Sequence, residues 1–262
     1  MSRNPWKTRG NLTMTRFYKK KYNPAMRIVA LAPVYNEKGK IGPTVAKVPR
    51  DAVSEIVVVS DGSDDGSDEE ARAAGATVVR HERVLGPGAA IRTGFDYALS
   101  KGYDVIVVMA GNNKDSPSEI PKLVEPIVAR GFDFVQGSRY CAGGNAGKMP
   151  LHRVILTRAY PWLVRLVTGF PITDATNGFR AIRAEVLRDP RIKLHQDWLN
   201  RGELEYYLQL KVLTLGYKVC EVPVTKIYPD IKNYWNYTKI RPFVDWFGNL
   251  QPIVYLTLGL RD

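Results

Sequence analysis

The residues best suited to chemistry lie in the stretch VVMAGNNKDSP, positions 107–117. The apolar run that leads into it has the pattern of a buried parallel strand, and ligands of open α/β sheets bind where such strands end. Asn112 and Asp115 carry the oxygen atoms that divalent cations prefer as ligands. Lys114 carries a cation that can meet an anionic ligand directly and that repels a nearby metal ion. The loop is therefore a candidate ligand site.

A second candidate loop is APVYNE, positions 32–37, which follows another apolar run. Pro33 ends the run, the Tyr35 ring can stack on a nucleobase, and the Glu37 carboxylate can accept hydrogen bonds from the base. Taken alone, the same residues also suit an ordinary capped turn.

Two glycine-containing stretches complete the set of candidate loops. In VVVSDGSDDGS, positions 57–67, Asp61 would lie beside the APVYNE loop if the two strands are neighbours. In GPGAAIRTG, positions 86–94, small residues open a helix whose free N–H groups can face a phosphate, with Gly88 and Arg92 as predicted contacts. A simple Asp/Gly/Ser turn and a plain helix start remain the structural alternatives.

Elements that position these loops can be read from the hydrophobic pattern. Short apolar runs that alternate with helical periodicity predict repeated β-α units and a mostly parallel sheet with helices on both faces. The expected strands are 27–34, 55–60, 76–81, 104–109, 132–140 and 217–228, and the expected helices include 68–74, 86–102, 116–131, 149–169 and 196–215. The fold class is therefore α/β.

The complete pattern resembles the family-2 glycosyltransferases of the GT-A (Rossmann-like) fold, and most of all the dolichol- or polyprenyl-phosphate mannose or glucose synthases. The motifs that carry the resemblance span most of the chain: APVYNE, VVVSDGSDDGS, GPGAAIRTGFDYA, the GNNKDSP loop, VQGSRY, TDATNGFRAIR, GYKVCEVPV and YTK at 237–239. The resemblance implies transfer of a hexose from a nucleotide sugar, of the GDP-mannose or UDP-glucose type, to a polyprenyl or dolichyl phosphate. It also implies an inverting reaction at the cytosolic face of a membrane.

The resemblance also implies roles for individual residues. The predicted nucleotide-sugar contacts are Pro33, Tyr35, Glu37, Asp61, Gly88, Arg92 and Gly111. The predicted acceptor contacts are Ser138, Arg139, Arg180, Lys232 and Lys239. The predicted catalytic set is Lys114, Asn112, Asp115, Arg139 and Asp174. For Asp174 the alternative is a helix cap or a salt bridge that orients Arg180.

The chain departs from the family pattern in the GNNKDSP loop. The family carries two metal-binding aspartates and a glutamine where this chain has Ala110, Asn112 and Lys114. Three interpretations stay open: Lys114 replaces the metal ion electrostatically, Asn112 and Asp115 bind Mg²⁺ or Mn²⁺ in a shifted frame, or the protein only binds the nucleotide sugar. Ser60 also stands where the family usually has an aspartate, and Lys232 and Lys239 fall in a region where the family has an arginine and a Ser-Lys pair.

Charge and composition indicate the partners. The net charge is +12, and the segment before Ile28 is basic without a single carboxylate, which favours a solvated tail or an anionic membrane surface as its partner. The segments 149–169, expected as a helix pair split at Pro161, and 242–260 are either core elements or interfacial helices, and neither is an uninterrupted membrane span. No nucleic-acid-binding motif is recognisable. The two cysteines and the lack of a secretory signal favour a cytoplasmic, membrane-peripheral protein.

These observations predict one catalytic domain with flanking segments. The expected parts are a basic tail at 1–26, a nucleotide-sugar-binding core at 27–140, an acceptor-binding part at 141–240 and a C-terminal apolar, amphipathic helix at 241–262. An enzyme with another small anionic acceptor and a non-catalytic nucleotide-sugar-binding protein are the alternative functions.

Overall fold

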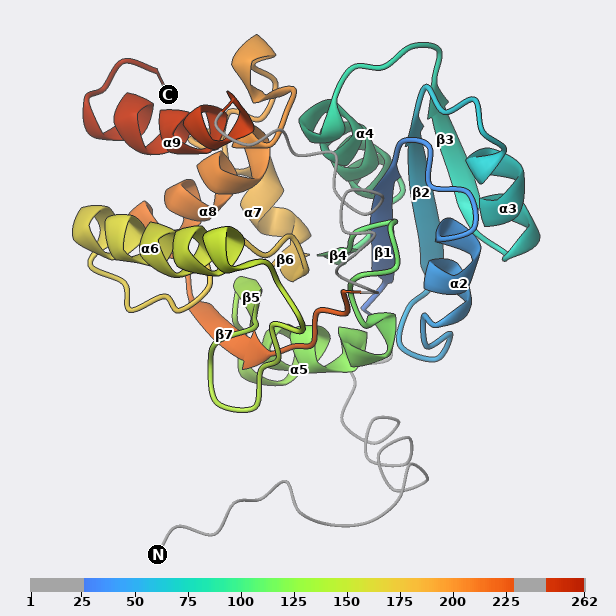
Figure 1. Ribbon diagram of the computed structural model, residues 1–262, viewed down its shortest axis with the longest axis horizontal. Helices are drawn as coiled ribbons and strands as arrows, with labels where there is room; N and C mark the ends of the chain where they lie inside the picture. Colours follow the sequence, from blue (N-terminus) through green and yellow to red (C-terminus); the bar gives the residue numbers. More distant parts are fainter. Residues whose placement is uncertain (1–25, 229–243, 262) are drawn as a thin grey trace, which may run out of the picture.

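The computed structural model describes residues 26–228 and 244–261, and a twisted sheet runs through the middle of the molecule (Figure 1). Within the described residues the sheet has the strand order β3-β2-β1-β4-β6-β5-β7. The strands are β1 (Ile28–Val34), β2 (Glu55–Asp61), β3 (Thr77–His81), β4 (Val105–Val108), β5 (Phe134–Ser138), β6 (Arg180–Arg183) and β7 (Val219–Pro223).

Helices connect most of these strands. They are α2 (Ile41–Ala46), α3 (Ser67–Ala73), α4 (Pro87–Ser100), α5 (Ile120–Arg130), α6 (Leu151–Thr168), α7 (Ala184–Arg188), α8 (Glu203–Thr214) and α9 (Val244–Thr257). Two short 3₁₀ helices, η1 (Pro117–Glu119) and η2 (Asp197–Leu199), precede α5 and α8.

The sheet is mostly parallel, as the sequence predicted. β1 pairs in parallel with both β2 and β4, β2 with β3, and β5 with β7. The exception is β6, which lies antiparallel between β4 and β5. It comes from the TDATNGFRAIR motif, and it joins the segment after residue 140 to the same sheet as the segment before it.

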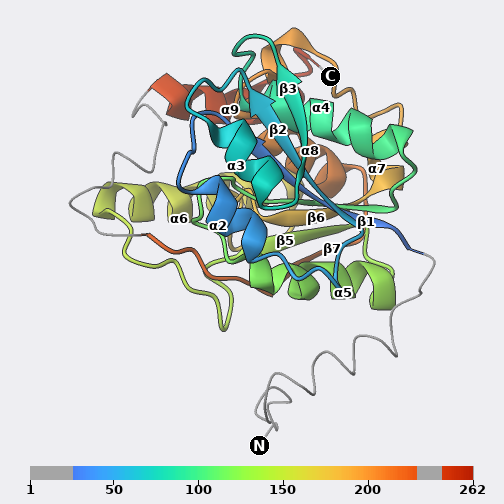
Figure 2. The ribbon, with the colours of Figure 1, turned by 90° about the vertical axis from the view of Figure 1, so that its right-hand side faces the viewer.

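Alternate residues of the central strands enter two separate cores. On one face, Ala30 and Ala32 of β1 pack with residues of α2, α3 and α5. On the other face, Val29 and Leu31 pack with residues of α4, α7 and α8. Because side chains of a strand point alternately to the two faces, a strand covered on both sides must be apolar throughout, which explains the continuous apolar runs of the sequence. The views in Figures 1 and 2 show helices on both sides of the sheet.

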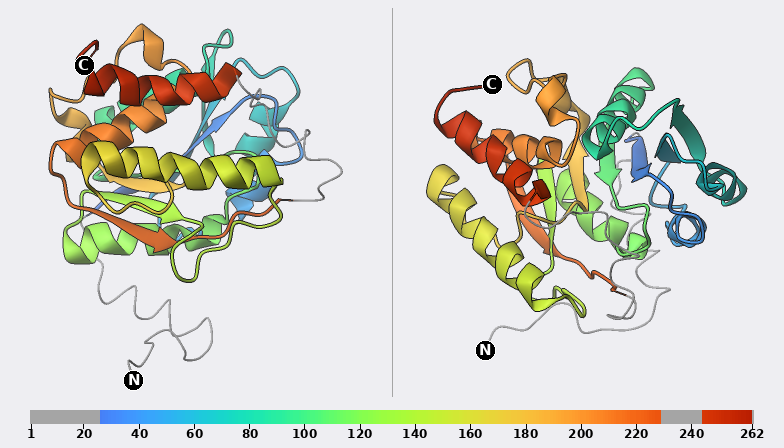
Figure 3. Two further views of the ribbon diagram at one scale, coloured as in Figure 1. Left: turned by 60° about the vertical axis from the view of Figure 1, so that its left-hand side comes forward. Right: turned by 45° about the horizontal axis from the view of Figure 1, so that its top comes forward.

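A further layer of helices covers α8. Buried Tyr160 and Val164 of α6 pack with Leu210 of α8, and Ile253 of α9 packs against the same cluster. Figure 3 shows α6 and α9 along the same side of the molecule. The Tyr160 hydroxyl donates a hydrogen bond to the backbone carbonyl of Asn249, 3.0 Å away, which ties α6 to α9.

Two predicted helical segments differ from the prediction. The expected helix pair at 149–169 is one continuous helix, α6, with Pro161 inside it. A proline costs a helix one backbone hydrogen bond, and here the ring is buried against the protein, where packing offsets that cost. The expected long helix at 196–215 is η2 followed by α8, with a break at 200–202. Among the described residues, no helix has both the length and the apolarity needed to cross a bilayer.

Candidate active site

The candidate site lies at the carboxyl ends of β1, β2 and β4. The chain adds β2 and β3 on one side of β1 and then continues with β4 on the other side. At such a reversal the loops that follow neighbouring strands part and leave a crevice, where ligands of doubly wound sheets bind. Three of the predicted loops, 35–40, 61–67 and 109–116, follow these three strands and therefore meet at this edge.

The first two loops are joined by reciprocal hydrogen bonds. The Asn36 amide nitrogen donates to Asp64 Oδ1 at 2.9 Å, and the Asp64 backbone N–H donates to Asn36 Oδ1 at 3.0 Å. Asn36 has a φ of 49°, a conformation that asparagine tolerates better than most residues. The turn leaves Tyr35 39% exposed, and the Glu37 carboxylate accepts a hydrogen bond from Lys40 Nζ at 2.7 Å. Tyr35 and Glu37 therefore lie on the loop at the carboxyl end of β1, where the sequence predicted nucleotide contacts.

Asp61 is buried, and its carboxylate is occupied by the protein itself. Its two oxygen atoms accept hydrogen bonds from the backbone N–H groups of Leu85 and Gly86, each at 2.8 Å, and Oδ1 lies 2.8 Å from His81 Nδ1. These contacts hold the 82–86 loop against the end of β2. Asp61 thus shapes the crevice, and its predicted contact with the nucleotide stays a prediction.

The start of α4 is covered by another segment, which differs from the open phosphate site that the GPG sequence suggested. The backbone N–H of Ala89 donates to the Asn200 carbonyl at 3.1 Å. A methyl group on Gly88 would come within 2.2 Å of the carbonyl oxygens of Leu199 and Arg201. Gly88 is therefore a glycine because the 199–201 segment lies directly on it.

Arg92 reinforces the same contact. Its guanidinium donates to the carbonyl of Leu194 at 3.2 Å and to Asn200 Oδ1 at 2.6 Å. Arg92 and Gly88 together hold the segment that leads into α8. Neither has a described contact that directs it to the crevice, so their predicted role toward the nucleotide sugar remains untested.

The GNNKDSP loop is packed tightly against β1. A methyl group on Gly111 would come within 2.5 Å of Val34 Cγ2 and 3.0 Å of the Pro33 carbonyl oxygen. Asn113 has a φ of 60°, and its side-chain oxygen accepts a hydrogen bond from Lys47 Nζ at 2.8 Å. The close approach of Gly111 to Pro33 brings the loop after β4 against the strand that carries the predicted nucleotide residues.

Lys114 is a buried lysine at this edge of the sheet. Its side chain is 4% exposed, and its Nζ lies 5.7 Å from the centre of the Tyr228 ring. Burial, followed by the positive charges of Arg153 and Lys226, lowers the pKa of Lys114 from 10.5 to about 7, although the carboxylates of Glu37 and Asp115 act in the opposite direction. A lysine that is costly to charge in the free protein is well suited to a ligand that brings negative charge.

Asp115, one of the predicted metal ligands, forms an ion pair with Lys226, a residue that was not among the predicted site residues. Lys226 Nζ lies 2.5 Å from Asp115 Oδ1 and 3.3 Å from Asn177 Oδ1, and Asp115 Oδ2 accepts a hydrogen bond from the Ala110 backbone N–H at 2.7 Å. The pair is buried, which excludes water from competing with it. Lys226 lies more than a hundred residues beyond Asp115 in the chain.

The described residues do not fit a divalent metal ion in this loop. No group of three or more His, Cys, Asp or Glu side chains in the described part of the chain could hold one. Asp115 is neutralised by Lys226, and Asn112 offers one neutral oxygen, which accepts the Lys114 backbone N–H at 3.4 Å. A cation bound here would have to displace one lysine and lie beside another.

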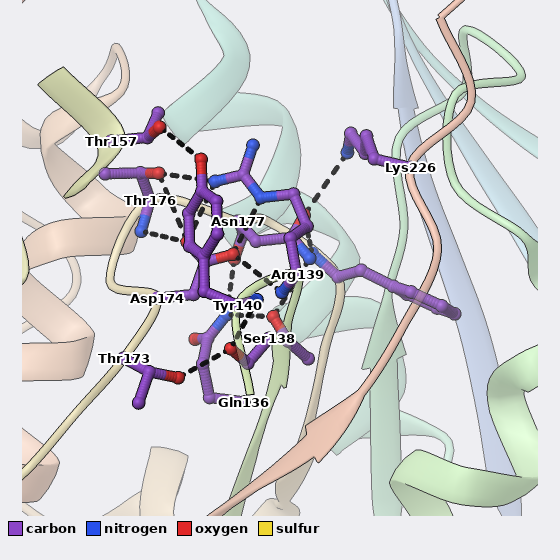
Figure 4. Close-up of polar contacts among 12 residues, drawn as sticks. Gln136, Ser138, Arg139, Tyr140, Thr157, Thr173, Asp174, Thr176, Asn177 and Lys226 are labelled. Carbon is purple, nitrogen blue, oxygen red and sulfur yellow. Dashed lines mark hydrogen bonds and ion pairs between the residues drawn. The ribbon is translucent and has the colours of Figure 1, made fainter. Parts of the chain in front are cut away.

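The predicted acceptor residue Arg139 forms a buried pair with Asp174 (Figure 4). Arg139 Nε donates to Asp174 Oδ2 at 2.7 Å, and Nη2 donates to Asp174 Oδ1 at 2.8 Å and to Thr176 Oγ1 at 2.6 Å. Burial would lower the pKa of the guanidinium, but the hydrogen bonds and charge of Asp174 outweigh burial and raise it. Arg139 is therefore a fixed cation, and Asp174 holds Arg139, where the sequence suggested a partner for Arg180.

Glu221 of β7 holds the loop that carries Asp174. Its carboxylate accepts hydrogen bonds from the backbone N–H groups of Thr173 and Asp174, at 2.8 and 2.9 Å. Burial raises the pKa of Glu221, and the hydrogen bonds from Thr173 partly offset that effect. Ser138 Oγ lies 2.7 Å from Thr173 Oγ1, so Ser138 helps to join β5 to the same loop.

Arg180, another predicted acceptor residue, is held by a different set of partners. Its guanidinium donates to the carbonyls of Glu205 and Asn177, at 2.9 and 2.8 Å, and lies 3.3 Å from Glu205 Oε1. Its described contacts fix the start of α8. The remaining two predicted acceptor residues, Lys232 and Lys239, lie outside the described residues.

A buried amide network, which sequence reasoning missed, connects these parts. Gln136 Nε2 donates to the Asn177 carbonyl at 2.7 Å, and Gln209 Nε2 donates to Gln136 Oε1 at 2.9 Å. A glutamine inside the apolar run of β5 was the only signal in the sequence, since a buried polar group needs a partner. The network links β5 and α8 to the Lys226 and Asp115 pair through Asn177.

Fold and sequence comparisons agree on the class of protein. The family profile described as Glycosyl transferase family 2 matches residues 30–189. The fold resembles solved structures of glucosyl-3-phosphoglycerate synthase from Mycobacterium tuberculosis; one of them, in complex with Mn²⁺ and UDP, gives a TM-score of 0.66 at 20% identity over 100% of this chain and 88% of that one. The chain therefore belongs to glycosyl transferase family 2, has the GT-A fold and is a glycosyltransferase.

Curated relatives narrow the group further. The undecaprenyl-phosphate mannosyltransferase of Micrococcus luteus is 33% identical over 213 residues, covering 79% of this chain and 86% of that protein. The polyprenol monophosphomannose synthase of Mycolicibacterium smegmatis is 34% identical over 209 residues, with 77% and 78% coverage. The dolichyl-phosphate hexose transferase of Haloferax volcanii is 31% identical over 229 residues, with 87% and 92% coverage. The predicted likeness to the polyprenyl-phosphate sugar synthases is confirmed.

Proposed function

We propose that this glycosyltransferase moves a hexose, with inversion, from a nucleotide sugar of the GDP-mannose or UDP-glucose type to a polyprenyl or dolichyl phosphate at the cytosolic face of a membrane. The names of the three curated relatives support the acceptor class. The observation that carries the mechanism is the burial of Lys114 at the carboxyl edge of β4, beside the loop that follows β1.

The donor would lie across the ends of β1 and β4. The base would stack near Tyr35 and bond to Glu37, which places the diphosphate over the Gly111 to Lys114 turn. Binding of the diphosphate favours the charged form of Lys114, so this side chain stabilises the negative charge that develops on the leaving group. We infer that Lys114 balances the charge of the diphosphate in this protein without a metal ion, since Asp115 is already neutralised by Lys226.

The acceptor needs no general base. A lipid phosphate is an anion near neutral pH and is nucleophilic without loss of a proton, so the enzyme has to bring two anionic groups together and orient them. Arg139 is fixed by Asp174, and its Nη1 makes no hydrogen bond to a described residue and points away from Asp174 in Figure 4. We propose that Nη1 contacts the acceptor phosphate. Lys232 and Lys239 remain predicted additional cations.

The reaction is a single displacement. An oxygen of the acceptor phosphate forms a bond to the anomeric carbon from the face opposite the diphosphate, and the bond from that carbon to the diphosphate breaks. The configuration at the anomeric carbon is inverted, and the nucleoside diphosphate leaves. Asp174 acts in this scheme by positioning Arg139 and takes no proton.

Transfer from labelled nucleotide sugars to a polyprenyl phosphate tests the proposal. The purified full chain is incubated with GDP-mannose, UDP-glucose or UDP-N-acetylglucosamine, with Mg²⁺ or Mn²⁺ in one arm and EDTA in the other. We expect product of inverted configuration in both arms, and a loss of at least about 100-fold in kcat for Lys114→Met, by analogy with removal of one charge-stabilising donor. Lys101→Met, at the far end of α4, is the matched control with unchanged kcat.

The possible outcomes separate the interpretations. Product only in the metal arm would overturn the role given to Lys114. Nucleotide affinity without product in either arm, for any nucleotide sugar, would favour a non-catalytic binding protein. Transfer to a soluble phosphorylated acceptor alone would replace the lipid acceptor by a small anionic one.

A further inference from the structure

The segment that follows β7 runs along the GNNKDSP loop and holds it at two successive positions. The backbone N–H of Ile227 donates a hydrogen bond to the Lys114 carbonyl at 2.7 Å. Lys226 lies opposite Asp115 in an antiparallel bridge, and their side chains form an ion pair. The main chain at Lys114 and Asp115 is therefore fixed by one segment from a distant part of the sequence.

Asp115 determines the shape of the loop because its two oxygen atoms have different partners. Oδ2 accepts the backbone N–H of Ala110 at 2.7 Å, which closes the loop on itself. Oδ1 lies 2.5 Å from Lys226 Nζ, which joins the loop to the segment after β7. The Asp115 side chain is only 1% exposed, so removal of Lys226 would leave a buried charge without compensation.

Lys226 is held in place on its other side as well. Its Nζ lies 3.3 Å from Asn177 Oδ1 (Figure 4). Asn177 Nδ2 donates to the Gly137 carbonyl at 2.9 Å, which fixes the side-chain amide with its oxygen toward Lys226. The ammonium group of Lys226 thus lies between a carboxylate oxygen and an amide oxygen, which are ligands that a hard divalent cation prefers.

The ammonium group of Lys226 therefore does part of what a bound ion would do. A divalent ion can neutralise a carboxylate and join it to an oxygen atom of another segment. Lys226 makes both contacts, to Asp115 and to Asn177. Because Lys226 is part of the chain, the order that it gives the loop does not depend on the concentration of any ion.

We propose that Lys226 is a positioning residue for the transfer reaction, which fixes the loop through Asp115 so that Lys114 reaches the diphosphate of the donor. The inference rests on the proposed function in one point, the contact between Lys114 and the diphosphate. Lys226 touches no reacting atom in this scheme and acts only through the loop.

An ion pair that serves stability alone is the alternative to this role. The two roles differ when both charges are removed together, because replacing both partners of a buried ion pair by neutral groups is often neutral for stability. Asp115→Asn/Lys226→Met should therefore recover the melting temperature that Lys226→Met alone loses. The double variant still lacks the side-chain link between the loop and the segment after β7, so Lys114 should remain misplaced.

Nucleotide binding and sugar transfer by the double variant test the role. Affinities for GDP, GMP, UDP and UMP are measured by calorimetry in EDTA, and kcat is measured with the nucleotide sugar that the unchanged protein uses. We expect a loss of about 100-fold in kcat, the effect of a displacement of about 1 Å on a positioned group. Affinity for the nucleoside diphosphate should fall by about 10-fold, the effect of losing one hydrogen bond to a charged group, while affinity for the monophosphate stays the same.

A surface ion pair provides the matched control. Glu125→Gln/Arg130→Met removes an exposed pair of α5, 3.3 Å apart, and should leave melting temperature, affinities and kcat unchanged. Two results with Asp115→Asn/Lys226→Met would overturn the inference. The first is recovery of kcat together with the melting temperature, which would mean that the pair serves stability alone. The second is an equal loss of affinity for the monophosphate and the diphosphate, which would mean that the whole site is disturbed.

The binding measurements separate this inference from the proposed function. An unchanged protein that prefers the diphosphate to the monophosphate but transfers no sugar would remove the proposed function. The role of Lys226 would then be decided by whether the double variant loses that preference. An unchanged protein that transfers sugar without any preference for the diphosphate would remove the contact with Lys114, and the inference with it.

Discussion

The burial of Lys114 has a measurable effect on stability. Its pKa is lowered from 10.5 to about 7, chiefly by burial and then by the charges of Arg153 and Lys226. A lowering of this size means that charging Lys114 costs the folded protein roughly 5 kcal/mol relative to the unfolded chain. Lys114→Met keeps the length of the side chain and removes the charge.

The effect depends on pH in a defined direction. Below about pH 7 both the folded and unfolded states carry the proton, so the full cost is present. As the pH rises through the folded-state pKa, the folded protein releases this proton while the unfolded chain keeps it until about pH 10.5, and the cost decreases. Because this cost decreases, the titration of Lys114 makes the free energy of unfolding roughly 2–3 kcal/mol higher at about pH 9 than at about pH 6.

Urea unfolding of the unchanged protein and of Lys114→Met at several pH values measures this contribution. Other titrating groups contribute to both proteins and cancel in the difference between the two curves. We expect Lys114→Met to be more stable, by several kcal/mol near pH 6 and by roughly 2–3 kcal/mol less than that near pH 9. Parallel curves would show that Lys114 is not charged at a cost in the folded protein, and the argument for its role would then fail. Lys101→Met, which removes an exposed lysine, should follow the unchanged protein.

Further predictions concern the residues around Lys114. Asp174→Asn leaves Arg139 as an uncompensated buried charge and should lower the free energy of unfolding by about 3–5 kcal/mol in urea titrations, while Asp51→Asn on the surface should have no such effect. Gly88→Ala forces a methyl group against two carbonyl oxygens and should cost at least about 2 kcal/mol in thermal unfolding, and a melting temperature equal to that of the unchanged protein would contradict the described packing. Lys226→Met leaves the Asp115 carboxylate buried without its cation and should lower the free energy of unfolding by about 3–5 kcal/mol in urea titrations, and a stability equal to that of the unchanged protein would argue against the ion pair.

The fold class could be predicted from the amino-acid sequence alone, and so could the edge of the sheet at which the candidate loops meet. Apolar runs covered on both faces have no alternative to a buried parallel sheet, and the carboxyl ends of parallel strands necessarily share an edge. The loops after β1, β2 and β4 could therefore be placed together from their positions alone. Lys114 could be singled out because a lysine beside a strand end that otherwise carries oxygen ligands changes the sign of the local charge.

Which of the candidate side chains remain available to a ligand depends on contacts that appear only in the folded protein. Asp61 accepts hydrogen bonds from the 82–86 loop, and Gly88 packs directly against the 199–201 segment. Asp115 pairs with Lys226, 111 positions further along the chain. Local periodicity carries no information on contacts between residues so distant in sequence, because these depend on which elements the topology makes neighbours. For the same reason the sequence left α6 either buried or interfacial, and only the packing of α6 on α8 and α9 showed that Leu151 and Leu166 face outward.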